Sequence, residues 1–214
     1  MIELWGRRNA YNVQKVLWIL GELALDYRHY DLGSNSGDLE TPEFMAMNPH
    51  ARIPVIRDDG AVVWESNTVL RYLAARYSAG DLWRQDPFER SLAERWMDWE
   101  LSKLQPDFIE LFWGYFRTPE ASRNMAQIEA AAGRCARHFE LLDAHLQRQP
   151  YLAGDDFSVG DIPCAVCLYR YFEMGFEVAQ PASVMQWYQR LANRSAYRKT
   201  VMTPFEELRG RVDF

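Results

Sequence analysis

The sequence is short of cysteine. It has three cysteines among its 214 residues, Cys135, Cys164 and Cys167, and three cannot all pair within one chain. A framework of disulfide bonds is therefore excluded as the basis of the fold. The first ten residues also lack the basic start and apolar core of a secretory signal. We therefore expect a protein of the reducing cytoplasm.

Basic runs and long apolar runs are missing as well. The net charge is −6 and no run of Lys and Arg occurs, which argues against nucleic acid as a partner. Charged residues interrupt every apolar stretch before it reaches the length of a membrane span, so no membrane partner is expected. Cys164 and Cys167 fall in an apolar helical pattern without a second ligand pair, and we interpret them as buried apolar side chains. No metal is expected, because metal-ligand spacing is also absent from the histidines His29, His50, His138 and His145.

The first third of the sequence contains a regular succession of short elements. Residues 2–5 alternate between apolar and polar and predict a strand. After a polar loop, apolar residues at 13, 16, 17, 20 and 23 follow the helical period, with Asn12 as the predicted cap. Residues 27–32 predict a second strand and residues 33–38 a loop. Thr41 and Pro42 predict the cap and first residue of a short helix that runs through Met47.

A hairpin signal follows. The apolar runs at residues 55–57 and 61–64 flank an Asp-Gly pair, Asp59-Gly60, which is typical of a tight β-turn. Ser66 is the predicted cap of a third helix, with apolar residues at 69, 70, 73, 74 and 77. The predicted order is β-α-β-α-β-β-α, which is that of an α/β thioredoxin-like fold. One helical crossover and one tight turn make its sheet mixed.

The second half has helical patterns throughout. After a polar linker at residues 81–87, a long helix is predicted through Phe116, with a kink at Pro106. Further helices are predicted from Thr118-Pro119 to about residue 149, from a capping box at residues 158–161 to about residue 172, from Pro181 and from Ser195. An α/β half followed by an all-helical half predicts two domains. These are a thioredoxin-like N-terminal domain over residues 1–80 and an all-α C-terminal domain over residues 88–214.

Four segments carry a resemblance to a known family. They are Leu4-Trp5-Gly6-Arg7 with Asn12-Val13-Gln14-Lys15-Val16, Asn48-Pro49-His50-Ala51-Arg52-Ile53-Pro54-Val55, Glu65-Ser66-Asn67, and Leu152-Ala153-Gly154 with Phe157-Ser158-Val159-Gly160-Asp161-Ile162. In the order and spacing of these segments, the sequence resembles the cytosolic glutathione transferases over nearly its whole length, in particular the bacterial theta-like and Nu-like members. The resemblance implies an enzyme that binds glutathione as co-substrate and forms a homodimer.

The resemblance also implies the residues that bind glutathione. The Ile53–Pro54 bond is expected to be cis, with the backbone of Ile53 pairing with the cysteinyl part of an extended tripeptide. Ser66 is assigned to the γ-glutamyl carboxylate, which the free N–H groups of a helix start suit, and Glu65 to the ammonium group beside it. Arg52 is the candidate for the glycyl end. The alternatives are a plain loop proline, a capping Ser66 with a dipole-favoured Glu65, and a solvated arginine.

At the catalytic position the sequence departs from the family pattern. Such transferases place a hydroxyl near the sulfur of glutathione, and the aligned residue here is Ala10. A methyl group donates no hydrogen bond, yet a free thiol with a pKa of about 8.5 needs its anion stabilised at neutral pH. We rank Asn12 first and Tyr11 second for this role, and Asn9 third, as a residue of the glutathione site. The N–H groups at the start of the first helix add a positive dipole end. The alternative for Asn12 is simple capping.

The pocket for the second substrate is expected between the two domains. Candidate lining residues are aromatic, and we select Phe112 and Trp113 from Phe108, Phe112, Trp113, Tyr115, Phe116, Tyr169 and Phe172. The alternative is that they are ordinary core. The leading hypothesis is a glutathione S-transferase whose bound thiolate attacks a hydrophobic electrophile. The alternatives are a glutathione-dependent disulfide-bond reductase at the same site and a non-catalytic glutathione- or ligand-binding protein.

Overall fold

The computed structural model describes residues 1–33, 39–80 and 82–212. Its first part contains one mixed sheet in the order β2-β1-β3-β4, with β1 parallel to β2 and antiparallel to β3. The strands are β1 (Ile2–Trp5), β2 (Tyr27–Tyr30), β3 (Val55–Asp58) and β4 (Ala61–Trp64). The predicted sheet is confirmed. Strand β2 ends two residues earlier than predicted, because the last residue of β1, Trp5, pairs with Tyr30. The loop predicted over residues 33–38 lies largely outside the described residues.

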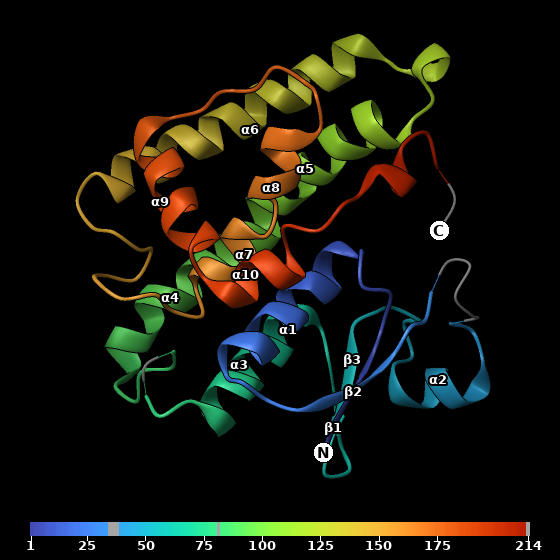
Figure 1. The fold of residues 1–214 in the computed structure, drawn as a ribbon, viewed down its shortest axis with the longest axis vertical. Coiled ribbons are helices and arrows are strands. Elements are labelled where there is room, and N and C mark those ends of the chain that lie inside the picture. Colours follow the sequence, from blue (N-terminus) through green and yellow to red (C-terminus); the bar gives the residue numbers. More distant parts are fainter. Residues whose placement is uncertain (34–38, 81, 213–214) are drawn as a thin grey trace.

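Three helices accompany the sheet (Figure 1), namely α1 (Tyr11–Glu22), α2 (Pro42–Met47) and α3 (Ser66–Tyr77). Thr41 caps α2 as predicted, since its hydroxyl accepts a hydrogen bond from the backbone of Phe44 at 3.2 Å. The prediction that Asn12 caps α1 is wrong. Tyr11 is buried with the apolar face, so the helix begins there, and Ala10 holds the cap position without a side-chain hydrogen bond.

The turn between β3 and β4 follows the Asp-Gly prediction. Asp59 has φ 48° and Gly60 has φ 88°, the left-handed conformations that a two-residue hairpin turn requires. Figure 1 shows α1 and α3 lying together on the side of the sheet that faces the later helices of the chain, and α2 on the other side.

The described residues after α3 form helices and no strand, apart from one isolated bridge between Tyr151 and Gly154. As predicted, one helix follows Pro181, which is α9, and another begins at Ser195, which is α10. The elements are α4 (Pro87–Trp99), η2 (Glu100–Leu104), α5 (Gln105–Phe112), η3 (Trp113–Arg117), η4 (Glu120–Ser122), α6 (Met125–Leu146), α7 (Asp161–Ala165), α8 (Leu168–Glu173), α9 (Ala182–Ala192), α10 (Ser195–Thr200) and η5 (Glu206–Leu208).

Two predicted helices differ from those observed. The helix predicted from Thr118 is instead a short 3₁₀ turn followed by α6, because the side chain of Asn124 caps a new start by accepting from the backbone of Gln127 at 3.2 Å. The capping box predicted at Ser158 forms only in part. The backbone N–H of Ser158 donates to the carboxylate of Asp161 at 2.9 Å, but the Ser158 hydroxyl also donates to that carboxylate, at 3.0 Å, and Gly160 holds the cap position. The helix itself begins at Asp161 and is interrupted between α7 and α8.

The long helix predicted through Pro106 contains a π-helical stretch, whose turn is wider than that of an α-helix. The segment η2 is π-helical and ends just before α5, in whose first turn Pro106 lies. A proline lacks the backbone N–H that would continue the preceding hydrogen bonds, and a π-helical turn is one way to accommodate this gap. The widened turn contains Glu100, whose side chain is fully buried.

Helix α1 joins the sheet to the second part of the chain. Trp18 lies edge-on to Tyr197 of α10, with ring centroids 4.6 Å apart. Gly21 faces the same helix so closely that an added Cβ would lie 2.9 Å from the Cβ of Ala196. The packing of α1 against α10 therefore depends on the absence of a side chain at Gly21.

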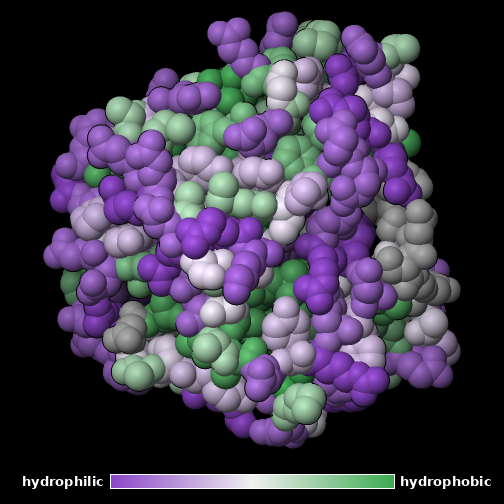
Figure 2. All heavy atoms as spheres, viewed as in Figure 1, coloured by the Kyte–Doolittle hydropathy of each residue, from purple (hydrophilic) through white to green (hydrophobic). Residues whose placement is uncertain are grey.

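The surface drawn in Figure 2 is predominantly hydrophilic, with hydrophobic side chains in groups between the charged ones. Across residues 1–33, 39–80 and 82–212, no helix is both long enough and apolar enough to cross a membrane.

Candidate functional site

A pocket of about 510 Å³ opens where the first part of the chain meets the helical part. It contains all ten residues that the sequence analysis selected as site residues. These are Asn9, Tyr11, Asn12, Arg52, Ile53, Pro54, Glu65, Ser66, Phe112 and Trp113. Its other lining residues are Arg7, Ala10, Leu39, Asn48, Gln105, Ile109, Arg117, Arg170 and Leu208.

The loop before β3 forms one wall. The Ile53–Pro54 bond is cis, as predicted. Asn48 holds the preceding turn, because its amide donates to the carbonyl of Arg52 at 2.9 Å and its Oδ1 accepts from the backbone of His50 at 3.1 Å. The side chain of Arg52 is exposed at the rim. Ile53 and Pro54 therefore line the pocket at the end of a turn that Asn48 stabilises.

The start of α3 forms the adjoining wall. Ser66 is the first residue of the helix rather than its cap, and Glu65 occupies the cap position with φ 66°. A non-glycine residue in this left-handed conformation costs on the order of 1–3 kcal/mol, which the surroundings must offset. One such contact is the amide of Asn67, which donates to the carbonyl of Met97 at 2.9 Å. The result is an exposed carboxylate on Glu65 beside a buried hydroxyl on Ser66, at a helix end with free N–H groups.

The first loop and the start of α1 form the floor. Ala10 is buried and offers only a methyl group. The Oδ1 of Asn12 is buried without a hydrogen-bond partner. Asn9 donates from its amide to Glu207 at 2.8 Å. The hydroxyl of Tyr11 donates to Glu100 at 3.0 Å, and burial raises the pKa of this tyrosine well above its ordinary value.

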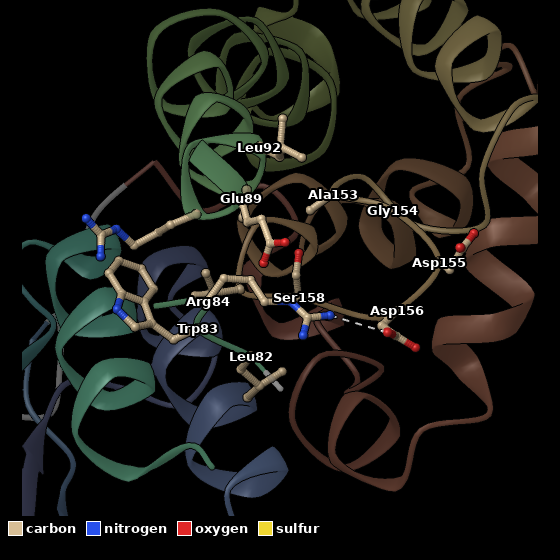
Figure 3. A pocket seen from close by; sticks show the side chains of 13 residues that line it. Leu82, Trp83, Arg84, Glu89, Leu92, Ala153, Gly154, Asp155, Asp156 and Ser158 are labelled. Atoms are coloured by element: carbon tan, nitrogen blue, oxygen red, sulfur yellow. Dashed lines mark hydrogen bonds and ion pairs between the residues drawn. The ribbon is translucent and has the colours of Figure 1, made fainter. Parts of the chain in front are cut away.

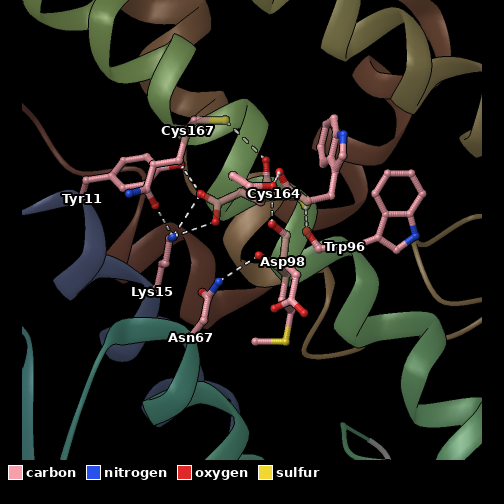
Figure 4. A network of polar contacts seen from close by, with 12 residues as sticks. Tyr11, Lys15, Asn67, Trp96, Asp98, Cys164 and Cys167 are labelled. Carbon is pink, nitrogen blue, oxygen red and sulfur yellow. Dashed lines mark hydrogen bonds and ion pairs between the residues drawn. The ribbon is translucent and has the colours of Figure 1, made fainter.

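Beneath the floor lies a buried ionic network that the sequence analysis missed (Figure 4). Lys15 of α1 contacts both carboxylate oxygens of Glu100 at 3.0 Å and the side chain of Gln105 at 2.8 Å. Lys15 and Glu100 are both 0% exposed. Burial raises the pKa of Glu100, and Lys15 opposes that rise. The network connects the start of α1 to the widened turn η2, so it supports the pocket floor from behind.

A second missed residue is Arg170 of α8. It is buried, and its guanidinium donates to the backbone carbonyl of Asn9 at 2.6 Å. Burial lowers its pKa to about 10. No local pattern indicates that this arginine is buried at the pocket, because its contact with Asn9 joins residues 161 positions apart in the sequence.

The aromatic candidates divide into two groups. Phe112 and Trp113 line the pocket together with Ile109, and the guanidinium of Arg117 lies 4.0 Å from the Trp113 ring centroid. The remaining five candidates are not among the pocket residues. Phe108 and Phe116 belong to the buried core, whereas Tyr115, Tyr169 and Phe172 pack against it.

The cysteines lie outside the site. All three are buried and free, as predicted for Cys164 and Cys167. Burial raises the pKa of both thiols well above the ordinary value, which keeps them protonated and unreactive. No group of three or more His, Cys, Asp or Glu residues within the described ranges is arranged to hold a metal ion.

A smaller cavity of about 300 Å³ lies at the start of α4, against residues 153–159 (Figure 3). Two of its charged side chains, Arg84 and Asp156, contact each other at 3.4 Å. None of the ten predicted site residues lines it, whereas all ten line the larger pocket, so the larger pocket is the candidate site.

The chain is similar to known proteins over nearly its whole length. Residues 1–75 match the family described as glutathione S-transferase, N-terminal domain, and residues 125–190 match glutathione S-transferase, C-terminal domain. The chain is 42% identical over 206 residues to glutathione S-transferase GstB of Escherichia coli K12, covering 95% of this chain and 99% of that protein. It is 30% identical over 208 residues to glutathione S-transferase 3 of Zea mays, covering 94% and 93%.

A solved structure is also close. The theta class glutathione S-transferase from Xanthomonas axonopodis pv. citri, determined with glutathione bound, superposes with a TM-score of 0.91 at 44% identity, covering 95% of this chain and 98% of that one. The pocket brings together the cis proline, the start of α3 and the start of α1. The sequence and structure matches cover nearly the whole length and show that the chain belongs to the glutathione S-transferase family.

Proposed function

We propose that the protein is a glutathione S-transferase that holds glutathione in the large pocket and activates its sulfur for attack on a hydrophobic electrophile. The observation that carries this proposal is the convergence of three backbone features on one cavity. They are the cis bond at Ile53–Pro54, the start of α3 at Ser66 and the start of α1 at Tyr11. An extended tripeptide with one anionic end and one zwitterionic end matches such an arrangement.

Each part of glutathione has a counterpart in the proposal. The γ-glutamyl carboxylate accepts hydrogen bonds from the N–H groups and hydroxyl at Ser66, and its ammonium group pairs with Glu65. The cysteinyl backbone pairs with the backbone of Ile53, which its neighbour Pro54 keeps open toward the pocket. Arg52 at the rim takes the glycyl carboxylate, and Asn9 contributes to the side near α1. These roles place the thiol over the start of α1.

The proposed activation uses the side chain of Asn12 and the dipole of α1. Asn12 is favoured over Tyr11 because the Tyr11 proton is already donated to Glu100, whereas Asn12 lines the pocket and carries an amide NH₂ group that can donate a hydrogen bond. Its NH₂ group donates to the thiolate. The thiol proton leaves to solvent, the sulfur forms a bond to the electrophilic carbon, and the leaving group departs with the bonding electron pair. Proximity and stabilisation of the thiolate supply the rate enhancement.

The second substrate is proposed to lie against Phe112, Trp113 and Ile109, which give the pocket an apolar side. A flat or apolar electrophile fits such a surface. We further infer that residues 1–80 and 88–214 form two domains, with the architecture changing between α3 and α4. We also infer a homodimer, for which the sedimentation mass in solution is the check.

A second candidate function uses the same site. Ala10 leaves the site without the expected hydroxyl. In this second function, the glutathione sulfur attacks a disulfide instead of a carbon electrophile. In this reductase reaction the glutathione sulfur bonds to one sulfur of the disulfide, and the other sulfur leaves as a thiolate. A third possibility, a protein that binds glutathione or an apolar ligand without turnover, also rests on Ala10.

The experiment combines calorimetry with glutathione and turnover of an aryl halide and of a small disulfide. Binding with faster turnover of the aryl halide supports the transferase, and faster turnover of the disulfide supports the reductase. Binding without turnover of either compound contradicts both. Asn12→Ala is expected to lower kcat, whereas Asn124→Ala, at the cap of α6 and outside the pocket, is the matched control. Absence of glutathione binding refutes the proposal as a whole.

A further inference from the structure

A buried guanidinium lies where the pocket meets the first loop. Arg170 is 4% exposed and is one of the pocket-lining residues. Its Nη2 donates to the backbone carbonyl of Asn9 at 2.6 Å. Asn9 directly precedes Ala10, where the family resemblance leads one to expect a hydroxyl. Arg170 is therefore fixed next to the one position at which this chain lacks its expected catalytic group.

This guanidinium makes no direct ion pair within the described residues, and its Nε is buried without a hydrogen-bond partner. The carboxylate of Glu207, to which Asn9 donates, favours the charged form of Arg170 from a greater distance. The neighbours of Arg170 are the rings of Phe112 and Phe205, whose centroids lie 5.4 and 5.8 Å from the guanidinium carbon. Burial lowers the pKa of Arg170 to about 10, so the group still carries its charge at neutral pH. A buried charge without a counter-ion is unfavourable, and an anion bound in the pocket would relieve that cost.

We propose that Arg170 contacts the sulfur of bound glutathione and stabilises its thiolate in place of the hydroxyl missing at Ala10. The inference rests on the proposed function. Of the three anions that glutathione brings, the glycyl carboxylate is assigned to Arg52 and the γ-glutamyl carboxylate to Ser66. The thiolate is the anion expected over the start of α1, and Arg170 is bonded to the loop that leads into that start. Arg170 stays protonated throughout, and the thiol proton leaves to solvent.

The other buried arginine of the pocket is held elsewhere. The Nε of Arg117 donates to the backbone carbonyl of Arg211 at 2.7 Å, and its guanidinium stacks on Trp113. These contacts hold Arg117 against Trp113 on the aromatic side of the pocket.

Arg7 also lines the pocket but is only half-buried. Arg170 is more deeply buried and is bonded to the loop before α1. It is therefore the cation that we assign to the sulfur, and its charge would act together with the amide of Asn12.

The test is a titration of the glutathione thiol in complex with purified wild-type protein, Arg170→Gln and Arg170→Lys, followed by thiolate absorbance. Arg170→Gln keeps an amide that can donate to Asn9 but removes the charge. An opposite charge within about 4–6 Å lowers a pKa by about 1–3 pH units, so this variant is expected to raise the bound thiol pKa by that amount. Arg170→Lys keeps the charge and is expected to retain most of the lowering.

The matched control is Arg190→Gln. Arg190 likewise donates one Nη2 to a backbone carbonyl, that of Pro150 at 2.7 Å, and likewise has a buried Nε without a partner. It lies in α9 and does not line the pocket. Its replacement is expected to leave the pKa of the bound thiol unchanged.

Binding of S-methylglutathione, which has no ionisable sulfur, separates the charge effect from damage to the site. The inference requires Arg170→Gln to bind this analogue as wild type does. An unchanged thiol pKa in Arg170→Gln overturns the inference. A change confined to the KM for an anionic electrophile also overturns it, because that result would assign the guanidinium to the second substrate. Loss of S-methylglutathione binding in both Arg170 variants also overturns it in favour of a structural role. Wild-type protein that fails to bind glutathione would instead refute the proposed function.

Discussion

Replacing Lys15 with methionine removes the counter-ion of a carboxylate that has no access to water. Lys15 and Glu100 are 0% exposed, and Lys15 donates to both oxygens of Glu100 at 3.0 Å. In Lys15→Met, the hydroxyl of Tyr11 still donates to the Oε1 of this carboxylate at 3.0 Å. Breaking a buried pair by removing one partner costs about 3–5 kcal/mol. For a chain of this size, that corresponds to a fall in Tm of about 6–20 °C.

The assay is urea unfolding of three variants against wild type. Lys15→Met is expected to lose about 3–5 kcal/mol of unfolding free energy. The double variant Lys15→Met/Glu100→Gln is expected to recover a large part of this loss, because the uncompensated charge is gone. Arg57→Met is the matched control, since its ion pair with Glu3 is 43% and 21% exposed and is expected to be worth less than about 1 kcal/mol.

The pH dependence gives a second check on the same pair. Burial raises the folded-state pKa of Glu100 above its ordinary value of 4.5 even with Lys15 in place. Without Lys15 that pKa rises further, so the folded state of the variant binds a proton more tightly than the unfolded chain does. The penalty is therefore smallest below about pH 4.5 and grows as the pH rises through the folded-state pKa. A loss below about 1 kcal/mol at neutral pH, or a loss independent of pH, would refute the reasoning.

The remaining predictions concern binding, packing and the helical part. Glu65→Gln removes the charge proposed to pair with the ammonium group of glutathione and is expected to weaken glutathione binding by about tenfold or more, as measured by calorimetry; unchanged affinity would remove Glu65 from the site. Gly21→Leu forces a side chain into the 2.9 Å approach to Ala196 and is expected to lower Tm, with a loss of at least about 1 kcal/mol; an unchanged Tm would mean that the α1–α10 contact is not tight. Asp161→Ala leaves the buried donors of Leu152, Ser158 and Trp187 unpaired and is expected to cost about 3 kcal/mol or more in urea unfolding; a cost under 1 kcal/mol would contradict the role of this carboxylate.

Local patterns were sufficient for the elements whose structure is decided locally. The Asp59-Gly60 pair specifies the hairpin because few other residues adopt its backbone conformation. Thr41-Pro42 specifies the start of α2 because the threonine hydroxyl accepts from a free N–H of the first turn and proline already has a helical φ. The cis bond at Pro54 was predicted from family resemblance, since an isolated proline gives no such signal.

The misses have a common physical cause, which is contact between residues far apart in the sequence. Lys15 meets Glu100 across 85 positions, and Arg170 meets Asn9 across 161. A lysine within an amphipathic helix is ordinarily interpreted as solvated, so nothing local indicated burial. The helices predicted for the second half were fewer and longer than those observed. The π-helical turn before α5 and the cap at Asn124 interrupt the helices, whereas the apolar pattern of the sequence stays periodic on either side of each interruption.

The central claim is that this pocket binds glutathione and stabilises its thiolate without a hydroxyl at Ala10. Titrating the thiol of glutathione bound to the wild-type protein tests this claim most directly. A free thiol of this kind has a pKa of about 8.5. The account predicts a bound thiol pKa lower by at least about one pH unit, because the start of α1, Asn12 and Arg170 all favour the anion. A bound thiol that titrates at its free value, with glutathione seated in the pocket, would contradict it.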